Sequence, residues 1–129
     1  MRFLLDTHAL LWWLSDDRRL GLHARTLIAD PGNTILVSVA SLWEIVVKQR
    51  VGKIEAEIGA IERVLEREGF GRLAITPVHL ECLSGLPRHH RDPFDHLLIA
   101  QAISEDAVLV SDDAVMALYA VDLQPCCDS

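Results

Sequence analysis

Short apolar runs alternate with helical segments along this chain, and this alternation constrains the fold more than any other feature. The runs at residues 2–5, 34–38 and 107–111 are rich in aliphatic or β-branched residues, which is typical of buried strands. Shorter candidates lie at residues 73–76 and 121–124. Strands that alternate with helices indicate a parallel sheet covered on both faces and joined by right-handed crossovers. We therefore expect an α/β protein, a single α/β/α sandwich with a four- or five-stranded parallel sheet.

The helical segments fill the intervals between these strands. The predicted helices are residues 7–14, 22–29, 41–50, 54–68, 77–83, 92–105 and 113–118. The clearest amphipathic pattern is in residues 54–68, where four aliphatic residues fall on one face, Ile54, Ile58, Ile61 and Leu65. A chain of 129 residues with no internal repeat, linker or low-complexity segment is expected to form one domain.

The charge balance limits how this chain could bind nucleic acid. It has 12 basic and 19 acidic residues, which give a net charge of −7. Binding that depends on charge alone is disfavoured, because the phosphate backbone is itself strongly negative. Any work on nucleic acid would need a local basic patch, or a metal ion that brings phosphate close to acidic residues.

The cysteines and the apolar segments indicate a cytoplasmic protein. Cys82, Cys126 and Cys127 are odd in number and form no CxxC motif, so we expect reduced thiols and no zinc site. Asp6 and His8 interrupt the N-terminal apolar run, which is not expected to be a signal peptide. No apolar stretch is long enough to predict a membrane span.

Four acidic residues fall where the predicted strands end or where the neighbouring helices begin. Asp6 ends the first strand, and Glu44 lies in the first turn of the helix predicted after the second strand. Asp95 lies in the first turn of the helix that follows Asp92, and Asp113 follows the strand at residues 107–111. The working crevice of such a sheet lies beyond the carboxyl ends of its strands, so we expect these four acids to lie together.

Helix capping explains each of these acids taken alone. Ser41 to Glu44 fits a capping box, and Asp92 to Asp95 fits the N-cap and first turn of a helix with proline at its first position. Ser111 to Asp113 also suits a helix start. Acids in a first turn interact with the helix dipole by roughly 0.3–1 kcal/mol. Capping does not, however, require the four carboxylates to converge.

A divalent cation explains the convergence. Two like charges about 4 Å apart repel by around 4 kcal/mol at an effective dielectric near 20, and a cation between them removes this cost. Carboxylate oxygens without a His/Cys array favour Mg²⁺ or Mn²⁺. Such an ion can supply a hydroxide nucleophile and stabilise a leaving oxygen, which is the chemistry of phosphodiester hydrolysis. Capping and metal binding are compatible, since one carboxylate can close a first turn and still present an outer oxygen.

Four segments resemble, in order, the motifs of PIN-domain ribonucleases, and more closely those of VapC-type toxins of toxin–antitoxin pairs. They are Leu5 to Trp12, Ser41 to Ile45, Asp92 to Asp95 and Val110 to Asp113. The resemblance covers nearly the whole chain and implies a single PIN-like nuclease domain over residues 1–129. It implies an endoribonuclease with one or two Mg²⁺ or Mn²⁺ ions, a homodimer, and a cognate antitoxin that covers the active site.

The resemblance also assigns roles to individual residues. The four acids of the family correspond to Asp6, Glu44, Asp95 and Asp113, as catalytic residues and metal ligands, with Thr7 and Ser111 in support. Many relatives carry arginine after the third motif, where this chain has His96. Asp112 is a fifth acid beside Asp113, so the match there is ambiguous by one position. The spacing from Ser111 favours Asp113.

Other residues allow two interpretations. The basic segment Arg88 to Arg91 is either an RNA phosphate contact or a solvated loop, and Lys48 is either part of a basic rim or an ordinary helix end. His8 is expected to be a packed, hydrogen-bonded histidine rather than a ligand. Trp12, Trp13 and Trp43 are expected to pack in the core or an interface rather than to stack on bases.

Two further hypotheses follow from the sequence. The apolar faces around Trp12 and residues 54–65 are candidate contact surfaces for a second copy or for the antitoxin. The alternative function is a non-catalytic module that binds RNA or protein, in which the acids are only helix caps. A phosphotransferase of the haloacid dehalogenase type is disfavoured, because His8 stands where that chemistry needs a second aspartate.

Overall fold

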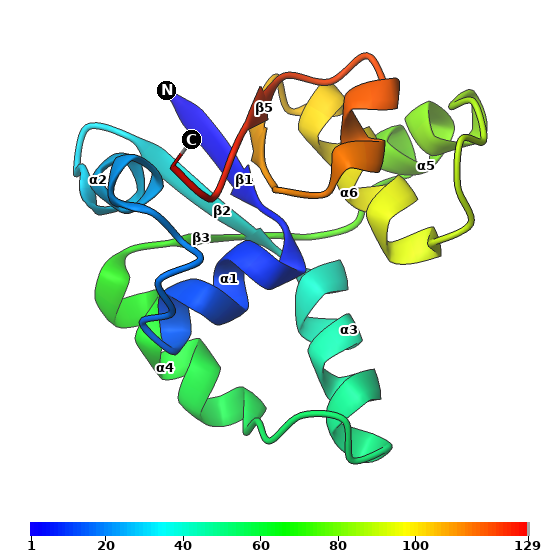
Figure 1. The fold of residues 1–129 in the computed structure, drawn as a ribbon. Helices are drawn as coiled ribbons and strands as arrows, with labels where there is room; N and C mark the ends of the chain where they lie inside the picture. Colours follow the sequence, from blue (N-terminus) through cyan, green and yellow to red (C-terminus); the bar gives the residue numbers. More distant parts are fainter. Residues whose placement is uncertain (129) are drawn as a thin grey trace.

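The computed structural model describes residues 1–128 and shows one sheet between two layers of helices (Figure 1). The strands are β1 (Arg2–Leu5), β2 (Thr34–Ser38), β3 (Gly71–Leu73), β4 (Val108–Val110) and β5 (Leu123–Gln124). The helices are α1 (Thr7–Leu14), α2 (Leu22–Ala29), α3 (Val39–Arg50), α4 (Ile58–Glu68), α5 (Pro77–Ser84) and α6 (Pro93–Ser104), with a 3₁₀ helix η1 (Ala114–Leu118). The predicted α/β sandwich is therefore confirmed.

The five strands are parallel and run in the order β3-β2-β1-β4-β5. The chain moves outward from β1 to β2 and β3, and then crosses to the other side of β1 to form β4 and β5. Strand order thus reverses between β1 and β4. In open sheets of this kind, ligands bind beyond the carboxyl ends of the strands at such a switch point.

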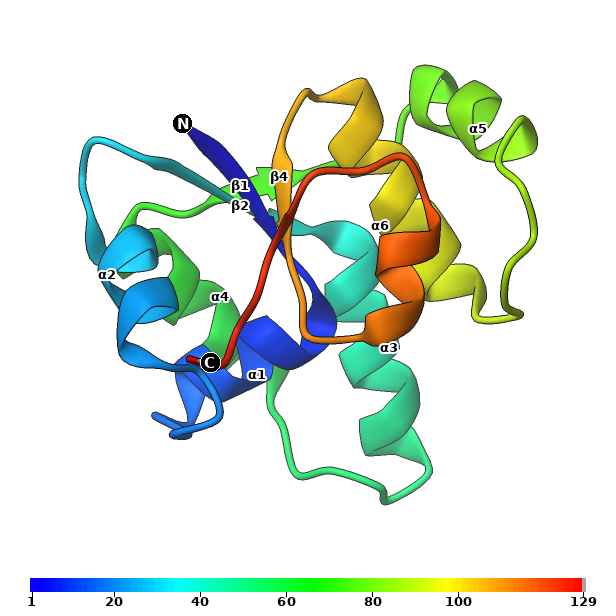
Figure 2. The same ribbon diagram turned by 45° about the horizontal axis from the view of Figure 1, so that its top comes forward.

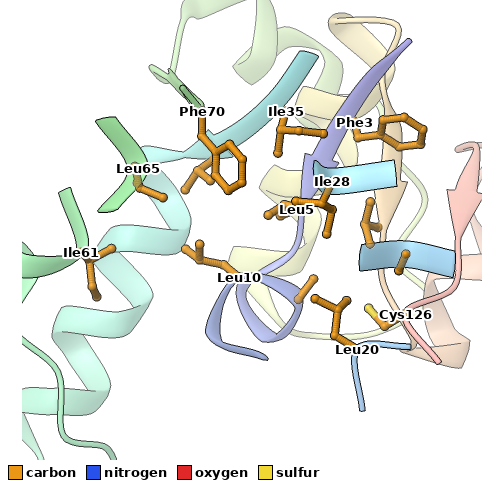
Figure 3. Packing of buried hydrophobic residues seen from close by; sticks show 14 of the residues in the cluster. Phe3, Leu5, Leu10, Leu20, Ile28, Ile35, Ile61, Leu65, Phe70 and Cys126 are labelled. Atoms are coloured by element: carbon orange, nitrogen blue, oxygen red, sulfur yellow. The ribbon is translucent and has the colours of Figure 1, made fainter. Parts of the chain in front are cut away.

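Alternating side chains of the strands supply two cores. On one face, residues such as Phe3, Leu5 and Ile35 pack with side chains of α1, α2 and α4 (Figure 3). On the other face, Leu4 and Leu109 pack with α6 and η1. Both faces of the central strands are buried, which explains why these strands are continuous apolar runs rather than alternating ones.

The third and fourth helices begin at positions that differ from the prediction. Helix α3 begins directly after β2, and its cap is Ser38, whose hydroxyl accepts a hydrogen bond from Ala40 N at 3.0 Å. Ser41 is consequently buried inside the helix and caps nothing. Helix α4 begins at Ile58 rather than at Ile54, because Glu57 caps it. The helix after Asp92 begins and ends as predicted to within one residue.

The apolar face of residues 54–65 serves the chain's own core. Ile61 and Leu65 are buried, and Ile54 packs against them although it lies before the helix. The prediction that this face is free for contacts is therefore wrong for most of its residues. The strand predicted at residues 73–76 was also misplaced, since β3 ends at Leu73 and pairs with β2.

No helix within residues 1–128 is long and apolar enough to cross a membrane. The three cysteines are free thiols, with Cys126 buried and Cys127 exposed.

Candidate functional site

Asp6 lies at the switch point of the sheet. Its backbone N–H donates to Val110 O at 3.1 Å, which ties the end of β1 to the end of β4. Its carboxylate caps α1 by accepting a hydrogen bond from Ala9 N at 2.7 Å. The side chain is only 4% exposed, and burial raises its pKa, an effect that hydrogen bonds from Ser111 and Ala9 oppose. Figure 2 shows β1 leading into α1 beside the segment that joins β4 to η1.

Glu44 is held by a contact between helices rather than by a cap. It lies in the second turn of α3, because that helix begins at Val39, and it is 7% exposed. Thr7 Oγ1 donates to Glu44 Oε1 at 2.7 Å, and Lys48 Nζ lies 3.1 Å from Glu44 Oε2. The predicted capping box between Ser41 and Glu44 is wrong, and the carboxylate instead faces the start of α1.

Asp92 and Asp95 divide the two roles that the sequence left open. Asp92 Oδ1 accepts hydrogen bonds from Phe94 N at 2.9 Å and from Asp95 N at 3.2 Å, so Asp92 is the cap of α6. The carboxylate of Asp95 makes no capping bond of this kind within the described chain. It lies 3.3 Å from His90 Nε2 through Oδ2. The cap therefore orients the first turn and leaves the second carboxylate for other contacts.

The electrostatics of Asp95 show that the predicted acids come together. The pKa of Asp95 is raised to about 7, first by burial and then by repulsion from the carboxylates of Asp92, Asp113, Glu44 and Asp6. Coulomb repulsion is effective only at short range in a partly solvated site. Asp6, Glu44 and Asp113 therefore lie within electrostatic reach of Asp95 at the carboxyl edge of the sheet.

The ambiguity between Asp112 and Asp113 has a structural answer. The carboxylate of Asp112 accepts hydrogen bonds from Cys126 N at 2.6 Å and from Cys127 N at 3.0 Å, so it anchors the C-terminal segment. Asp113 caps η1 by accepting from Val115 N at 3.1 Å. Its charge also contributes to the raised pKa of Asp95. The geometry favours Asp113 as the fourth acid.

A cleft of about 310 Å³ lies at the carboxyl end of β1 and β4, lined by Asp6, His8, Trp12, Arg19, Asp112 and Asp113. His8 is exposed in this cleft and its charge favours the ionised form of Asp6, so the prediction of a packed histidine is wrong. Trp12 is half-buried, with the Arg19 guanidinium 5.0 Å from its ring centroid.

The other two tryptophans behave differently. Trp13 packs against the core as predicted, with its ring centroid 5.8 Å from that of Phe70. Trp43 is 58% exposed, so core packing is wrong for it. Its ring meets that of Phe94 edge-on, with centroids 4.8 Å apart.

The donor set fits a hard divalent cation by its chemistry, because all four acids offer only carboxylate oxygens. Among residues 1–128, however, no three His, Cys, Asp or Glu side chains already converge as metal ligands. Glu44 is paired with Lys48, and Asp95 faces His90. Asp6, Glu44 and Asp113 thus lie within electrostatic reach of Asp95, while side-chain partners from the protein occupy Glu44 and Asp95.

Sequence reasoning missed the contact that ties the basic loop to this site. Tyr119 is buried, and its hydroxyl accepts a hydrogen bond from His89 N at 3.1 Å. The same hydroxyl lies 2.8 Å from His90 Nδ1. If the Tyr119 hydroxyl donates its hydrogen bond to His90 Nδ1, the imidazole carries its own proton on Nε2. The Nε2–H group then donates a hydrogen bond to Asp95. No local pattern could have predicted this link, since 29 residues separate His90 from Tyr119.

The fold and the site together define an α/β protein with a doubly wound parallel sheet and carboxylates at its switch point. The sequence model of the PIN domain family matches residues 3–122. Because this match covers most of the chain, the chain belongs to the PIN domain family. A search of curated proteins found no match.

Solved structures share this fold over nearly their whole length. The VapBC2 complex from Rickettsia felis, bound to a promoter DNA fragment, matches with a TM-score of 0.77, 18% identity and coverage of 97% of this chain and 98% of that one. VapBC-1 from nontypeable Haemophilus influenzae matches with a TM-score of 0.67, 21% identity and coverage of 97% and 98%. VapBC-5 from Mycobacterium tuberculosis matches with a TM-score of 0.60, 18% identity and coverage of 98% of both chains. At these identities the likeness shows a common fold.

Proposed function

We propose that this chain is the VapC-type toxin of a toxin–antitoxin pair and hydrolyses RNA phosphodiester bonds with Mg²⁺ or Mn²⁺. The observation that carries the proposal is the position of Asp6, Glu44 and Asp113 around Asp95, where burial first and then repulsion from these carboxylates raise the pKa of Asp95 to about 7. Membership of the PIN domain family and the similarity to VapBC structures support it.

In this proposal the carboxylates of Asp6, Glu44, Asp95 and Asp113 would hold one or two ions. The cation would supply a hydroxide nucleophile and stabilise the leaving oxygen. Thr7 orients Glu44 by donating to it, and Ser111 lowers the cost of ionising Asp6 through a hydrogen bond. Both hydroxyl residues are buried, so their own rotamers are restricted by packing.

Three basic residues complete the proposed substrate site. Arg88 and Arg91 are exposed on the loop that leads into Asp92, where they are available to RNA phosphates. Lys48 forms an ion pair with Glu44. It therefore neutralises a carboxylate in this arrangement, and its predicted contact with RNA requires that this pair opens.

The proposed partners are an antitoxin and a second copy of the chain, both acting in the cytoplasm. Helix α3 and its C-cap carry an exposed apolar stripe at intervals of four residues, consisting of Val39, Trp43, Val47 and the cap residue Val51. Residues four apart lie on one helix face, so these side chains form a continuous surface. An exposed apolar face of this kind is typical of a protein contact surface.

The test is cleavage of labelled single-stranded RNA by the purified chain, freed of any antitoxin, with Mg²⁺ or Mn²⁺. We expect cleavage that EDTA abolishes and that Asp95→Asn lowers by at least about 100-fold, since the site loses a charged ligand. Asp122→Asn is a matched control, because Asp122 is exposed and lies outside the acid group. Cleavage that survives both EDTA and Asp95→Asn would contradict the proposal.

The alternative is a binding module in which the acids act only as caps. Calorimetry with Mn²⁺ separates the two functions. The nuclease is expected to bind Mn²⁺ and to lose this binding in Asp6→Asn and Asp113→Asn. A protein that binds RNA but takes up no Mn²⁺ would support the module.

A further inference from the structure

A cavity of about 610 Å³ opens beside the carboxylates rather than among them. It is lined by Arg88, His89, His90, Arg91, Pro93 and His96, and none of these residues is acidic. The wall is a single stretch of chain, formed by the loop before α6 and by the first turn of that helix. In a chain with a net charge of −7, such a lining is a local reversal of charge.

The two arginines of this wall belong to the four that form no ion pair within residues 1–128, the other two being Arg18 and Arg50. Of the ten arginines in the chain, six form ion pairs, Arg2, Arg19, Arg25, Arg63, Arg67 and Arg72. Among the contacts of residues 1–128, neither Arg88 nor Arg91 forms one, although carboxylates follow them closely in sequence. Their guanidinium groups are thus free to bind an anion, and their planar fork matches the oxygens of a phosphate.

A third member of the wall also has unused hydrogen-bonding capacity. His96 Nε2 is buried and has no hydrogen-bond partner within the described residues. A buried polar atom normally has a partner, so one is expected from outside the chain. His96 also lines a neighbouring cavity of about 220 Å³, together with Arg88. The two hollows therefore share one arginine and one imidazole.

His90 links this cavity to the carboxylates. Its ring stands edge-on to that of His96, with centroids 4.6 Å apart, and its Nε2 lies 3.3 Å from Asp95 Oδ2. One side chain therefore borders both the basic cavity and the acidic site. A ligand that spans the two must offer negative charge at the cavity and a reactive bond at the carboxylates, and a strand with regularly spaced phosphates does so.

We propose that this cavity binds a phosphate group of a single-stranded RNA substrate, adjacent to the phosphodiester that is cleaved at the carboxylates. The inference rests on the proposed function for the identity of the substrate. It explains how a strongly acidic protein retains a polyanion, because Arg88 and Arg91 supply the local basic patch that the overall charge lacks. The volume of about 610 Å³ is in the range of sites that hold a nucleotide-sized ligand.

The first test measures the binding of a fluorescent single-stranded RNA in EDTA, where cleavage does not contribute. The double variant Arg88→Gln/Arg91→Gln is compared with Arg18→Gln/Arg50→Gln, which changes the net charge equally at two exposed arginines outside the cavity. We expect the first variant to lose at least tenfold in affinity, and the slope of log K against log salt to fall by about 0.7, the value for one phosphate on a single strand. Equal losses in the two variants, or no loss in either, overturn the proposal.

The second test uses inorganic phosphate and the imidazole NMR signals of His96 in the metal-free protein. We expect phosphate to shift these signals in the wild-type chain and in Arg18→Gln/Arg50→Gln, but not in Arg88→Gln/Arg91→Gln. A response to phosphate without any loss of RNA affinity in the cavity variant overturns the assignment to RNA. A melting temperature close to that of the wild type shows that each variant is folded.

The two proposals fail in different ways. If the wild-type chain cleaves RNA but the cavity variant binds RNA as tightly as the wild type, the nuclease function stands and the phosphate site is ruled out. If the cavity variant loses RNA binding but the wild-type chain cleaves no RNA with any metal, the phosphate site stands and the nuclease function is ruled out.

Discussion

Thr7 and Glu44 are joined by a hydrogen bond of 2.7 Å that connects the first turn of α1 with the middle of α3. Both side chains are buried, at 3% and 7% exposure. Glu44 is therefore aimed by a residue 37 positions earlier in the chain, rather than by the helix start that its local sequence suggests. This contact places the second acid beside the one that follows β1.

Replacing Thr7 by valine tests whether this contact positions Glu44. Valine keeps the shape but leaves a buried carboxylate oxygen without its donor, so we expect a loss of about 1–3 kcal/mol in the free energy of unfolding. We also expect Mn²⁺ affinity to fall by about 10-fold or more, as for other residues that orient a ligand. Denaturant unfolding and calorimetry measure the two effects. Thr7→Ser, which keeps the hydroxyl, should retain both properties, and equal behaviour of the two variants would contradict this role.

The raised pKa of Asp95 predicts how stability depends on pH in the absence of metal. Its pKa is about 7 in the folded chain against a usual value of 3.8, so the folded state favours the protonated form. The contribution to stability is complete below the usual pKa and is lost as pH rises through about 7. Because Asp95 is only partly buried, solvent screening reduces this contribution to about 1–2 kcal/mol.

Urea unfolding of the wild type and of Asp95→Asn, in EDTA at pH 5, 6, 7 and 8, measures this contribution. We expect the asparagine variant to gain stability relative to the wild type as pH rises over this range. Binding of Mn²⁺ should release protons near neutral pH, because the metal requires the ionised carboxylate. A difference between the two proteins that does not vary with pH would show that the pKa of Asp95 is not raised.

Asp112 and Asp113 are expected to respond oppositely to the same change. Asp113→Asn should keep the cap of η1, because asparagine caps as well as aspartate, while RNA cleavage falls by about 100-fold with the loss of a charged ligand. Asp112→Asn should retain most activity and loosen residues 126–127, whose N–H groups donate hydrogen bonds to the Asp112 carboxylate. Cleavage assays and hydrogen exchange of the C-terminal segment distinguish the two, and the reverse pattern would exchange their roles.

Tyr119→Phe tests the link between the basic loop and Asp95. The change removes a buried hydroxyl that accepts from His89 N and bonds His90 Nδ1, so we expect a loss of about 1–2 kcal/mol in stability. Faster hydrogen exchange at residues 88–91 and a several-fold lower rate of RNA cleavage should accompany it. Tyr119→Leu also removes the aromatic ring. Its loss of unfolding free energy beyond that of Tyr119→Phe measures the contribution of packing apart from that of the hydrogen bonds. Unchanged exchange in the loop would contradict the link.

The parts of the site that the sequence predicted correctly depend on contacts between near neighbours. Asp92 and Pro93 define the start of α6 within three residues, so the separation of a cap from a second carboxylate at Asp95 follows from local geometry. The alternation of strands and helices, and hence the parallel sheet, follows from the apolar runs and from the crossovers that parallel strands require. These patterns placed three of the acids at the carboxyl edge with the correct helix or strand.

The predictions that were wrong concern helix starts, where two local patterns are equally acceptable and the tertiary structure uses only one of them. Ser38 and Ser41 are both acceptable caps, and the pairing of β2 with β3, which extends to Ser38 opposite Leu73, decides in favour of the first. Residues 54–57 have a helical period, yet Glu57 ends up as the cap of α4. In each case, local propensity is worth a few tenths of a kcal/mol, and burial of the core outweighs it.

The sequence by itself determined the class of fold and predicted which acids follow the strands or begin the helices, because periodic apolar residues and helix caps act over a few positions. Only the tertiary structure decided what each acid faces. Glu44 faces Thr7 and Lys48, Asp112 faces the C-terminal backbone, and Asp95 faces a histidine held by a distant tyrosine. These partners lie far apart in the chain, except for Lys48 and His90, and the free energy of such contacts comes from burial and hydrogen bonding that exist only once the sheet has assembled.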